Sequence, residues 1–148
     1  MAGPTSVLAT TSATSFGGRS GGKTALTGDG GSNGRLWFHM EHAKGLGGSG
    51  EGTNPEQLFA LGYATCFNSA LLFVAAAQKI DASKAQVTCD VGIGKNEAGG
   101  FALQAKLTVK IPGVEASQAQ ALVEAAHQVC PYSNATRGNM PVELVVAS

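Results

Sequence analysis

Apolar and polar residues alternate along two neighbouring stretches in the second half of the chain. Every second residue of 86–93 is apolar, and the same period of two runs through residues 101–111 after the turn "GKNEAGG". A period of two is typical of β-strands that bury one face. The two stretches therefore predict a β-hairpin.

A long apolar run with helical spacing precedes this hairpin. Thr53 or Asn54 can cap a helix whose first residue is Pro55, and the pattern predicts that it continues to about Lys79. Residues 58–77 carry no charge and are long enough to span a membrane. Polar residues interrupt the run, so we favour the alternative, a buried core helix.

The rest of the chain shows shorter signals. Residues 1–34 are rich in Gly, Ser and Thr, and their turn signals "GGRSGG" and "TGDGGSNG" predict short strands, the last one being "RLWFHM". "HAKGLGGSGEG" predicts a flexible connection. Residues 115–130 have helical spacing that Pro131 should end, and residues 141–147 predict a final strand. The order of elements indicates a single α+β domain over residues 1–148 with antiparallel pairing.

Composition narrows the function classes. Lys plus Arg and Asp plus Glu each number ten, without long runs of one sign, so the basic surface of a nucleic-acid-binding protein is missing. Small molecules or other proteins are the expected partners. The first residues do not resemble a secretion signal, which predicts a cytoplasmic protein without a membrane anchor. Three cysteines in a reducing compartment are not expected to form a structural disulfide framework.

Each cysteine lies on an apolar stripe of its predicted element. Cys89 is on the apolar face of a strand, where a free thiol behaves as a small hydrophobic side chain. Cys66 and Cys130 lie on the stripes of the two predicted helices. Periodicity alone therefore nominates none of them as catalytic.

His127 and Cys130 are three residues apart and share one helical face, which is also a spacing of metal ligands. A tetrahedral site would need Cys66, His39 or His42 as well, and no motif supports that set. A Cys–His hydrolase with His127 as base is a second alternative, again without a local signature.

Four segments resemble the organic hydroperoxide resistance proteins of the OsmC-like group. They are "GGRSG", "GTNPEQLFALGYATCFNSAL", "VGIGKNEAGGFALQAKLTVKIPG" and "AHQVCPYSNATRGN". The resemblance implies an OsmC-like α+β fold in an intertwined homodimer, with sheets wrapped around long buried central helices. It also implies a thiol peroxidase without cofactor or metal, which reduces organic hydroperoxides and is recycled by dihydrolipoyl groups on carrier proteins. A thiol sensor or an OsmC-like ligand-binding module is the alternative.

The same resemblance assigns roles to four residues. Cys66 matches the peroxidatic cysteine, Cys130 the resolving cysteine, and Arg19 and Glu56 their polar partners, whereas Cys89 matches no motif. A free cysteine is only about 3% ionised at pH 7, so a thiolate nucleophile needs a nearby positive charge. Arg19 can supply it, although a solvated turn arginine is an equally ordinary interpretation.

Glu56 raises a geometric difficulty. It precedes Cys66 by ten residues, or about 15 Å along a continuous helix, so the two side chains cannot touch. Arg19 must bridge them, the partner chain must approach, or the helix must break near Gly62.

Aromatic and aliphatic residues around Cys66 can form a pocket for bulky alkyl or fatty-acid hydroperoxides. The candidates are Phe59, Tyr63, Phe67 and Leu71. They can equally be ordinary core residues.

Overall fold

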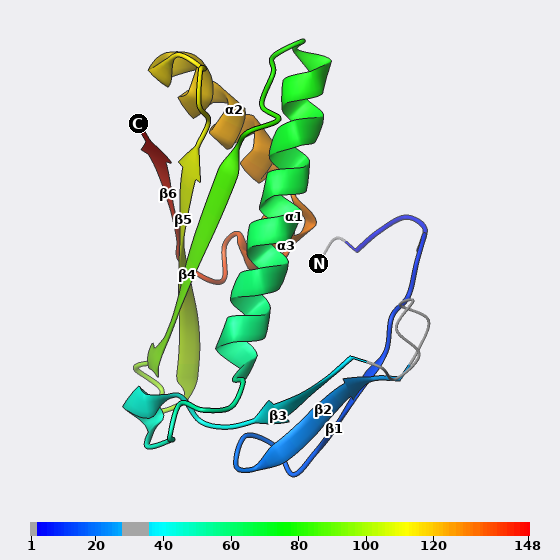
Figure 1. The fold of residues 1–148 in the computed structure, drawn as a ribbon, viewed down its shortest axis with the longest axis vertical. Helices are drawn as coiled ribbons and strands as arrows, with labels where there is room; N and C mark the ends of the chain where they lie inside the picture. The colour runs from blue at the N-terminus through cyan, green and yellow to red at the C-terminus, as the bar shows by residue number, and fades with distance from the viewer. Residues whose placement is uncertain (1–2, 28–35) are drawn as a thin grey trace. The chain divides into compact units, whose positions relative to one another are not determined.

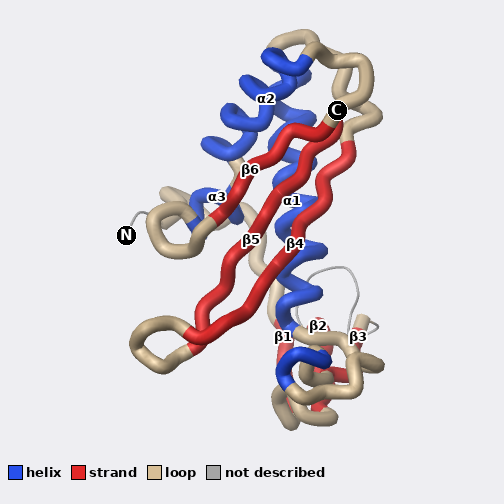
Figure 2. Tube along the Cα trace, turned by 90° about the vertical axis from the view of Figure 1, so that its left-hand side faces the viewer, coloured by secondary structure: helices blue, strands red, loops and turns tan. Residues whose placement is uncertain are grey.

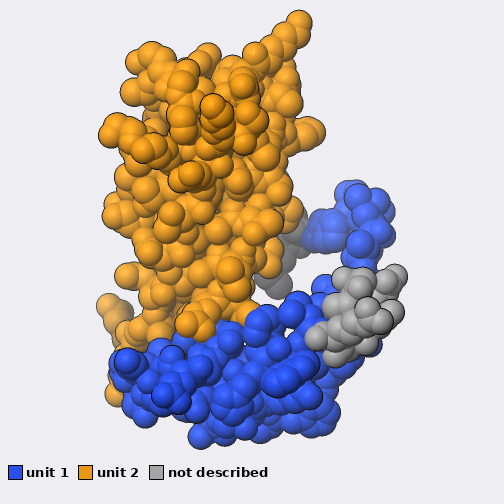
Figure 3. Space-filling model, in the orientation of Figure 1, with its two compact units in different colours: residues 1–55 blue, residues 56–148 orange. Residues whose placement is uncertain are grey.

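The computed structural model describes residues 3–27 and 36–148 and divides the chain into two compact units. The first unit ends at Pro55 and the second comprises Glu56–Ser148 (Figure 3). The second unit contains both cysteines of the proposed pair.

The first unit is built on a small antiparallel sheet. Its strands are β1 (Ala13–Phe16), β2 (Gly22–Leu26) and β3 (Trp37–Met40), in the order β1-β2-β3. Short strands are what the sequence predicts here. Most of the predicted turn between β2 and β3, residues 28–35, lies outside the described residues.

The segment after β3 was expected to be a flexible connection, but it is folded. It contains one turn of 3-10 helix, η1 (Lys44–Leu46), and returns along the end of β3. The Glu41 N–H donates to the Thr53 carbonyl at 2.9 Å, and the Thr53 N–H donates to the His39 carbonyl at 2.9 Å. These bonds satisfy backbone groups that a free loop would leave to water.

Helix α1 (Pro55–Ala77) begins at the predicted proline and ends two residues before the predicted position. It ends in a Schellman motif, because the Ile80 N–H donates to the Ala75 carbonyl and the Lys79 N–H to the Ala76 carbonyl. Lys79 occupies the left-handed position, with φ of 55°, where glycine is the usual residue.

Among the described residues, α1 is long and apolar enough to cross a membrane by length and composition. The core helix of a water-soluble protein meets the same criterion. Tyr63, Phe67 and Leu71 of α1 are fully buried in the core of the second unit, whereas Leu61 and Phe73 on its other sides are exposed.

The second unit packs helices against one face of a three-stranded sheet. Strands β4 (Gln86–Lys95), β5 (Phe101–Lys110) and β6 (Val142–Ala147) follow the order β4-β5-β6. The predicted hairpin of β4 and β5 is confirmed. Helices α1 and α2 (Ala116–Val129) lie on the same side of this sheet (Figures 1 and 2).

Alternation along β5 explains this layering. Ala105, Leu107 and Val109 are buried, whereas Lys106 and Lys110 between and after them are exposed. One face of β5 therefore contributes to the core that α1 and α2 cover.

One expectation about the last third of the chain was wrong, and another was confirmed but incomplete. Strand β6 pairs with β5 in parallel, because the helical connection between them returns the chain to the same end of the sheet. The predicted end of α2 before Pro131 is confirmed, but Pro131 also begins a further helix, α3 (Pro131–Thr136). Proline is well suited to the first position of a helix, where its missing N–H is not needed.

Candidate active site

Two sulfur atoms from distant parts of the second unit lie next to each other. Cys66 is partly exposed on α1, and Cys130 is fully buried between α2 and α3. Their Sγ atoms are 3.5 Å apart although 64 positions separate them in the sequence. The fold thus brings together the two cysteines that the resemblance pairs.

The backbone at Cys130 explains how its sulfur reaches α1. Cys130 is extended, with φ of −66° and ψ of 123°, and serves both as the last cap of α2 and the first cap of α3. Its N–H donates to the Ala126 carbonyl at 2.9 Å, and its carbonyl accepts from the Asn134 N–H at 2.9 Å. One extended residue between two helices therefore fixes the corner that carries the buried thiol.

The surroundings of Cys66 oppose ionisation within this unit. Burial raises the pKa of the Cys66 thiol, a backbone hydrogen bond from Tyr132 lowers it, and the neighbouring Cys130 raises it again. A thiolate at Cys66 therefore needs a positive charge in addition to the Tyr132 N–H.

Cys89 differs from Cys66 in its neighbours. It lies on β4 against the core, and burial together with the negative charge of Asp90 raises its pKa to about 11. A thiol with this pKa is almost entirely protonated at neutral pH and is a weak nucleophile.

Arg19 and Glu56 lie in different units. Arg19 is partly exposed in the turn between β1 and β2, where Gly17 and Gly18 have φ of 74° and 60°. Glu56 is buried in the first turn of α1. Because α1 is unbroken, about 15 Å along its axis separates Glu56 from Cys66. The roles of Arg19 and Glu56 at Cys66 stay predictions.

Gly62 does not break the helix. The position requires glycine because a larger residue would meet Tyr132. A Cβ at this position would lie 2.7 Å from Oη of Tyr132 and 3.1 Å from its Cζ. The absence of a side chain lets the Tyr132 ring lie against α1, one turn before Cys66.

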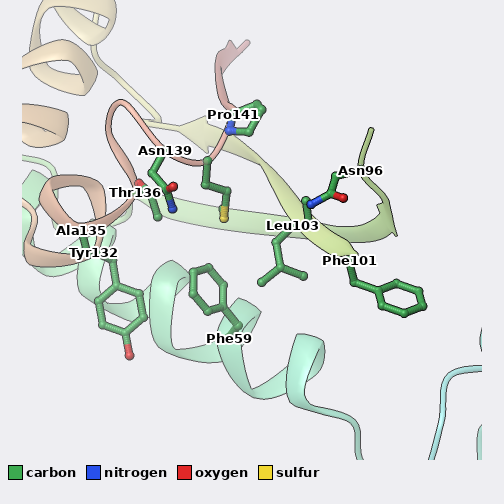
Figure 4. Close-up of a pocket in the computed structure, with 11 residues that line it drawn as sticks. Phe59, Asn96, Phe101, Leu103, Tyr132, Ala135, Thr136, Asn139 and Pro141 are labelled. Atoms are coloured by element: carbon green, nitrogen blue, oxygen red, sulfur yellow. The ribbon is translucent and has the colours of Figure 1, made fainter. Parts of the chain in front are cut away.

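An apolar groove of about 850 Å³ opens beside this ring, between α1, the start of β5, α3 and the segment that follows α3. Phe59 of α1 lies between Leu103 of β5 and Tyr132 of α3, with 5.8 Å between the Phe59 and Tyr132 ring centroids (Figure 4). Of the four predicted pocket residues, Phe59 alone is in the lining of this groove. Tyr63, Phe67 and Leu71 are fully buried in the core.

A group of buried hydroxyls, which the sequence patterns did not indicate, joins α1 to α3. The Tyr63 hydroxyl lies 3.0 Å from Ser133 Oγ and 3.3 Å from Thr136 Oγ1. Ser133 and Thr136 follow Cys130 at intervals of three, and this helical spacing was the signal that could have identified them.

His127 is half-buried near the same corner, and its surroundings do not favour a charged ring. Burial and the positive charge of Arg137 lower its pKa. Arg137 donates to the carbonyl of His127 and, at 2.8 Å, to Oδ1 of Asn134. Within residues 3–27 and 36–148, no three His, Cys, Asp or Glu side chains are arranged to hold a metal ion.

Comparison with known proteins gives concordant similarities. The family model described as OsmC-like protein matches residues 48–145. The organic hydroperoxide resistance protein of Xanthomonas axonopodis pv. citri is 46% identical over 99% of this chain and 100% of its own length.

Solved structures agree with the sequence comparison. An organic hydroperoxide resistance protein from Elizabethkingia anophelis, crystallised with thiocyanate bound, is 49% identical with a TM-score of 0.86, over 96% of this chain and 98% of that one. A protein of the same description from Legionella pneumophila is 43% identical with a TM-score of 0.88, over 97% and 100% of the two chains.

Proposed function

Because the chain belongs to the OsmC-like family and, within it, to the organic hydroperoxide resistance proteins, we propose that it is a cysteine-based peroxidase that reduces organic hydroperoxides to alcohols. The observation that carries the proposal is the 3.5 Å approach of a partly exposed sulfur, Cys66, to a buried one, Cys130. The accessible Cys66 thiol can react with the substrate, and the buried Cys130 thiol is close enough to react with Cys66 afterwards.

In the first step, the Cys66 thiolate attacks the terminal oxygen of the hydroperoxide. The O–O bond breaks, the alkoxide takes up a proton and leaves as an alcohol, and Cys66 becomes a sulfenic acid. Sulfur is oxidised by two electrons and the peroxide is reduced by two.

In the second step, the Cys130 thiol attacks the sulfenic sulfur and water leaves. The product is a Cys66–Cys130 disulfide, which protects Cys66 from irreversible over-oxidation. The two sulfurs must approach by only about 1.5 Å to reach the length of an S–S bond.

Arg19 is the group that we propose stabilises the Cys66 thiolate. Its planar guanidinium can hold a thiolate and the Glu56 carboxylate at the same time, so Glu56 needs no direct contact with Cys66. The raised pKa of Cys66 within its own unit is the reason that such a cation is needed.

The apolar groove supports a preference for bulky substrates. Phe59 and Tyr132 line it, and the backbone N–H of Tyr132 reaches Cys66. We propose that the alkyl part of the hydroperoxide lies along these rings. Hydrogen peroxide would gain nothing from that contact.

The disulfide is proposed to be reduced by a dithiol such as a dihydrolipoyl group on a carrier protein, so no bound cofactor is required. Cys130 is fully buried, which favours a slim dithiol on a flexible arm over a thiol fixed in a globular surface. After the first exchange the dithiol closes its own ring and completes the reduction intramolecularly. We also propose a cytoplasmic location, where dithiols are kept reduced.

A thiol redox sensor without turnover is the second candidate, and the same sulfur pair supports it. The two functions differ in the steady state. A peroxidase consumes many equivalents of hydroperoxide when dihydrolipoate is supplied, whereas a sensor consumes one.

The test is peroxide consumption with dihydrolipoate, thioredoxin or glutathione at equal concentration. We expect sustained turnover with dihydrolipoate and far slower turnover with the others. Cys66→Ser should abolish the activity, and Cys130→Ser should reduce one equivalent before over-oxidation inactivates it. Cys89→Ser is the matched control and should keep its rate. Thioredoxin as effective as dihydrolipoate would refute the proposed reductant. Undiminished turnover in Cys66→Ser would refute the peroxidase mechanism.

A further inference from the structure

Three buried hydroxyl groups form a second connection between α1 and α3, parallel to the sulfur pair. Tyr63 and Ser133 are completely buried and Thr136 is 5% exposed. Tyr63 precedes Cys66 by three residues on α1, and Ser133 follows Cys130 by three residues on α3. Tyr63 therefore lies on the same face of α1 as Cys66. Ser133 lies in the first turn of α3, directly after the cap residue Cys130.

Counting protons fixes the direction of these hydrogen bonds. Thr136 Oγ1 donates its proton to the Ser133 carbonyl at 3.2 Å, so it can only accept from Tyr63. The Tyr63 proton is then used on Thr136, so the 3.0 Å contact with Ser133 must have Ser133 as donor. The series of hydrogen bonds therefore runs from the Ser133 hydroxyl to Tyr63, from Tyr63 to Thr136, and from Thr136 to the Ser133 carbonyl. All three hydroxyl protons are used.

These hydrogen bonds help to hold α3 in the core. Four of its six residues, Pro131, Tyr132, Asn134 and Ala135, are exposed, whereas Ser133 and Thr136 are buried. The short helix therefore rests in the core through Cys130 and the two hydroxyl residues. It also carries the Tyr132 N–H that bonds to Cys66.

We propose that Tyr63 is a positioning residue, whose hydroxyl anchors α3 and so holds the Cys130 sulfur in reach of Cys66. This inference rests on the proposed roles of the two cysteines as attacking and resolving thiols. The Tyr63 hydroxyl does not touch the peroxide. It determines how fast the Cys130 thiol forms the disulfide with Cys66.

An aromatic disulfide that releases a coloured thiolate separates the two events without any peroxide. Cys66 displaces the first coloured thiolate and forms a mixed disulfide. Cys130 then displaces the second and forms the Cys66–Cys130 bond, so two electrons pass from the cysteine pair to the reagent. Cys89 is replaced by alanine in every sample so that two thiols remain.

Tyr63→Phe keeps the buried ring but leaves Ser133 and Thr136 without their shared partner. We expect the second release to slow about fivefold to tenfold more than the first, the rate equivalent of one buried hydrogen bond. Thr136→Val should reproduce this split, and Thr136→Ser, which keeps the hydroxyl, should restore the second rate.

Ser69→Ala is the matched control, because the Ser69 hydroxyl is also on α1 but donates at 2.9 Å to the Thr65 carbonyl of its own helix. Both of its rates should equal those of wild type. If Tyr63→Phe fails to fold, Thr136→Val is the deciding variant. An unchanged second release in a folded Tyr63→Phe or Thr136→Val protein overturns the positioning role.

The outcome is independent of the peroxidase proposal. A protein that shows the split but no hydroperoxide turnover keeps the positioning role of Tyr63 and loses the peroxidase function. A wild-type protein that turns over hydroperoxide, together with an unaltered second release in Tyr63→Phe, keeps the peroxidase function and loses the positioning role.

Discussion

Cys66 and Cys89 show how neighbours decide the chemistry of a thiol. Both are partly exposed, and burial raises the pKa of both. Cys66 has a backbone N–H and a second sulfur beside it, whereas Cys89 has the negative charge of Asp90. Only Cys66 has a neighbour that stabilises a thiolate and another that can resolve its oxidised form.

Removal of the Arg19 charge should raise the pKa of Cys66. A nearby cation favours the thiolate, so in Arg19→Ala the rate of Cys66 alkylation should reach its midpoint at higher pH than in wild type. Arg19→Lys should fall between them, since an ammonium keeps the charge but not the planar fork.

Lys23→Ala is the matched control for Arg19, because it removes another cation of the first unit. The Lys23 ammonium lies 4.7 Å from the centre of the Trp37 ring. Its loss should leave the alkylation midpoint unchanged. The same midpoint in Arg19→Ala would transfer the activating role to another cation, with Arg137 the next candidate.

Cys89 should make the protein less stable in alkaline solution. Its pKa rises from 9.0 to about 11 in the folded state, so between these values the unfolded chain has already lost the proton that the folded chain keeps. The free energy of unfolding must then fall as pH rises through this window. Urea denaturation at pH 8.5 and 10.5 should show a smaller loss in Cys89→Ser than in wild type. An equal loss in both proteins would contradict the raised pKa.

At the scale of elements, Gly62 links α1 to the groove. Gly62→Ala should gain about 1 kcal/mol of helix propensity, but its Cβ would displace the Tyr132 ring and offset that gain. We expect an almost unchanged free energy of unfolding together with a several-fold higher KM for an aromatic hydroperoxide. A crystal structure of the variant with Tyr132 unmoved would disprove this reasoning.

Element boundaries were the part of the fold that the sequence predicted best. The alternation of residues 86–93 and 101–111 located β4 and β5, because a half-buried strand must alternate. The parallel pairing of β6 was not predictable in this way, since the pattern of one strand does not name its neighbour. Helix α3 was missed because Pro131 is equally compatible with the end of one helix and the start of another.

The candidate site was only partly accessible from sequence. The resemblance paired Cys66 with Cys130, but their periodicity fits packing as well as catalysis. Tyr63, Phe67 and Leu71 had the same ambiguity, and burial places them in the core. The distance between residues 64 positions apart is a property of the fold, which no local pattern contains.

At the scale of the whole molecule, α1 presents large apolar side chains to solvent. Leu61 and Leu72, three helical turns apart on one side, are 64% and 41% exposed, and Phe73, on the adjacent side, is 70% exposed. Large exposed apolar groups gathered along one helix indicate an interaction surface. They support the predicted homodimer.

Phe73→Glu should therefore weaken the dimer, because a carboxylate would be buried at the contact. Sedimentation velocity should show a shift toward monomer at micromolar concentration. Val129→Glu on α2 places the same charge at another exposed apolar position, 44% exposed, and should leave the distribution unchanged. Equal sedimentation of wild type and Phe73→Glu would exclude this face of α1 from the contact.

The sequence distance between the two adjacent sulfurs also bears on how long the protein survives. A covalent link across 64 positions restricts the unfolded chain, by an amount worth about 4 kcal/mol in the loop-entropy description. The oxidised chain should then open less often than the reduced one, and a protease that cuts only opened molecules should degrade it more slowly. Oxidation of the cysteine pair would therefore lengthen the lifetime of the protein.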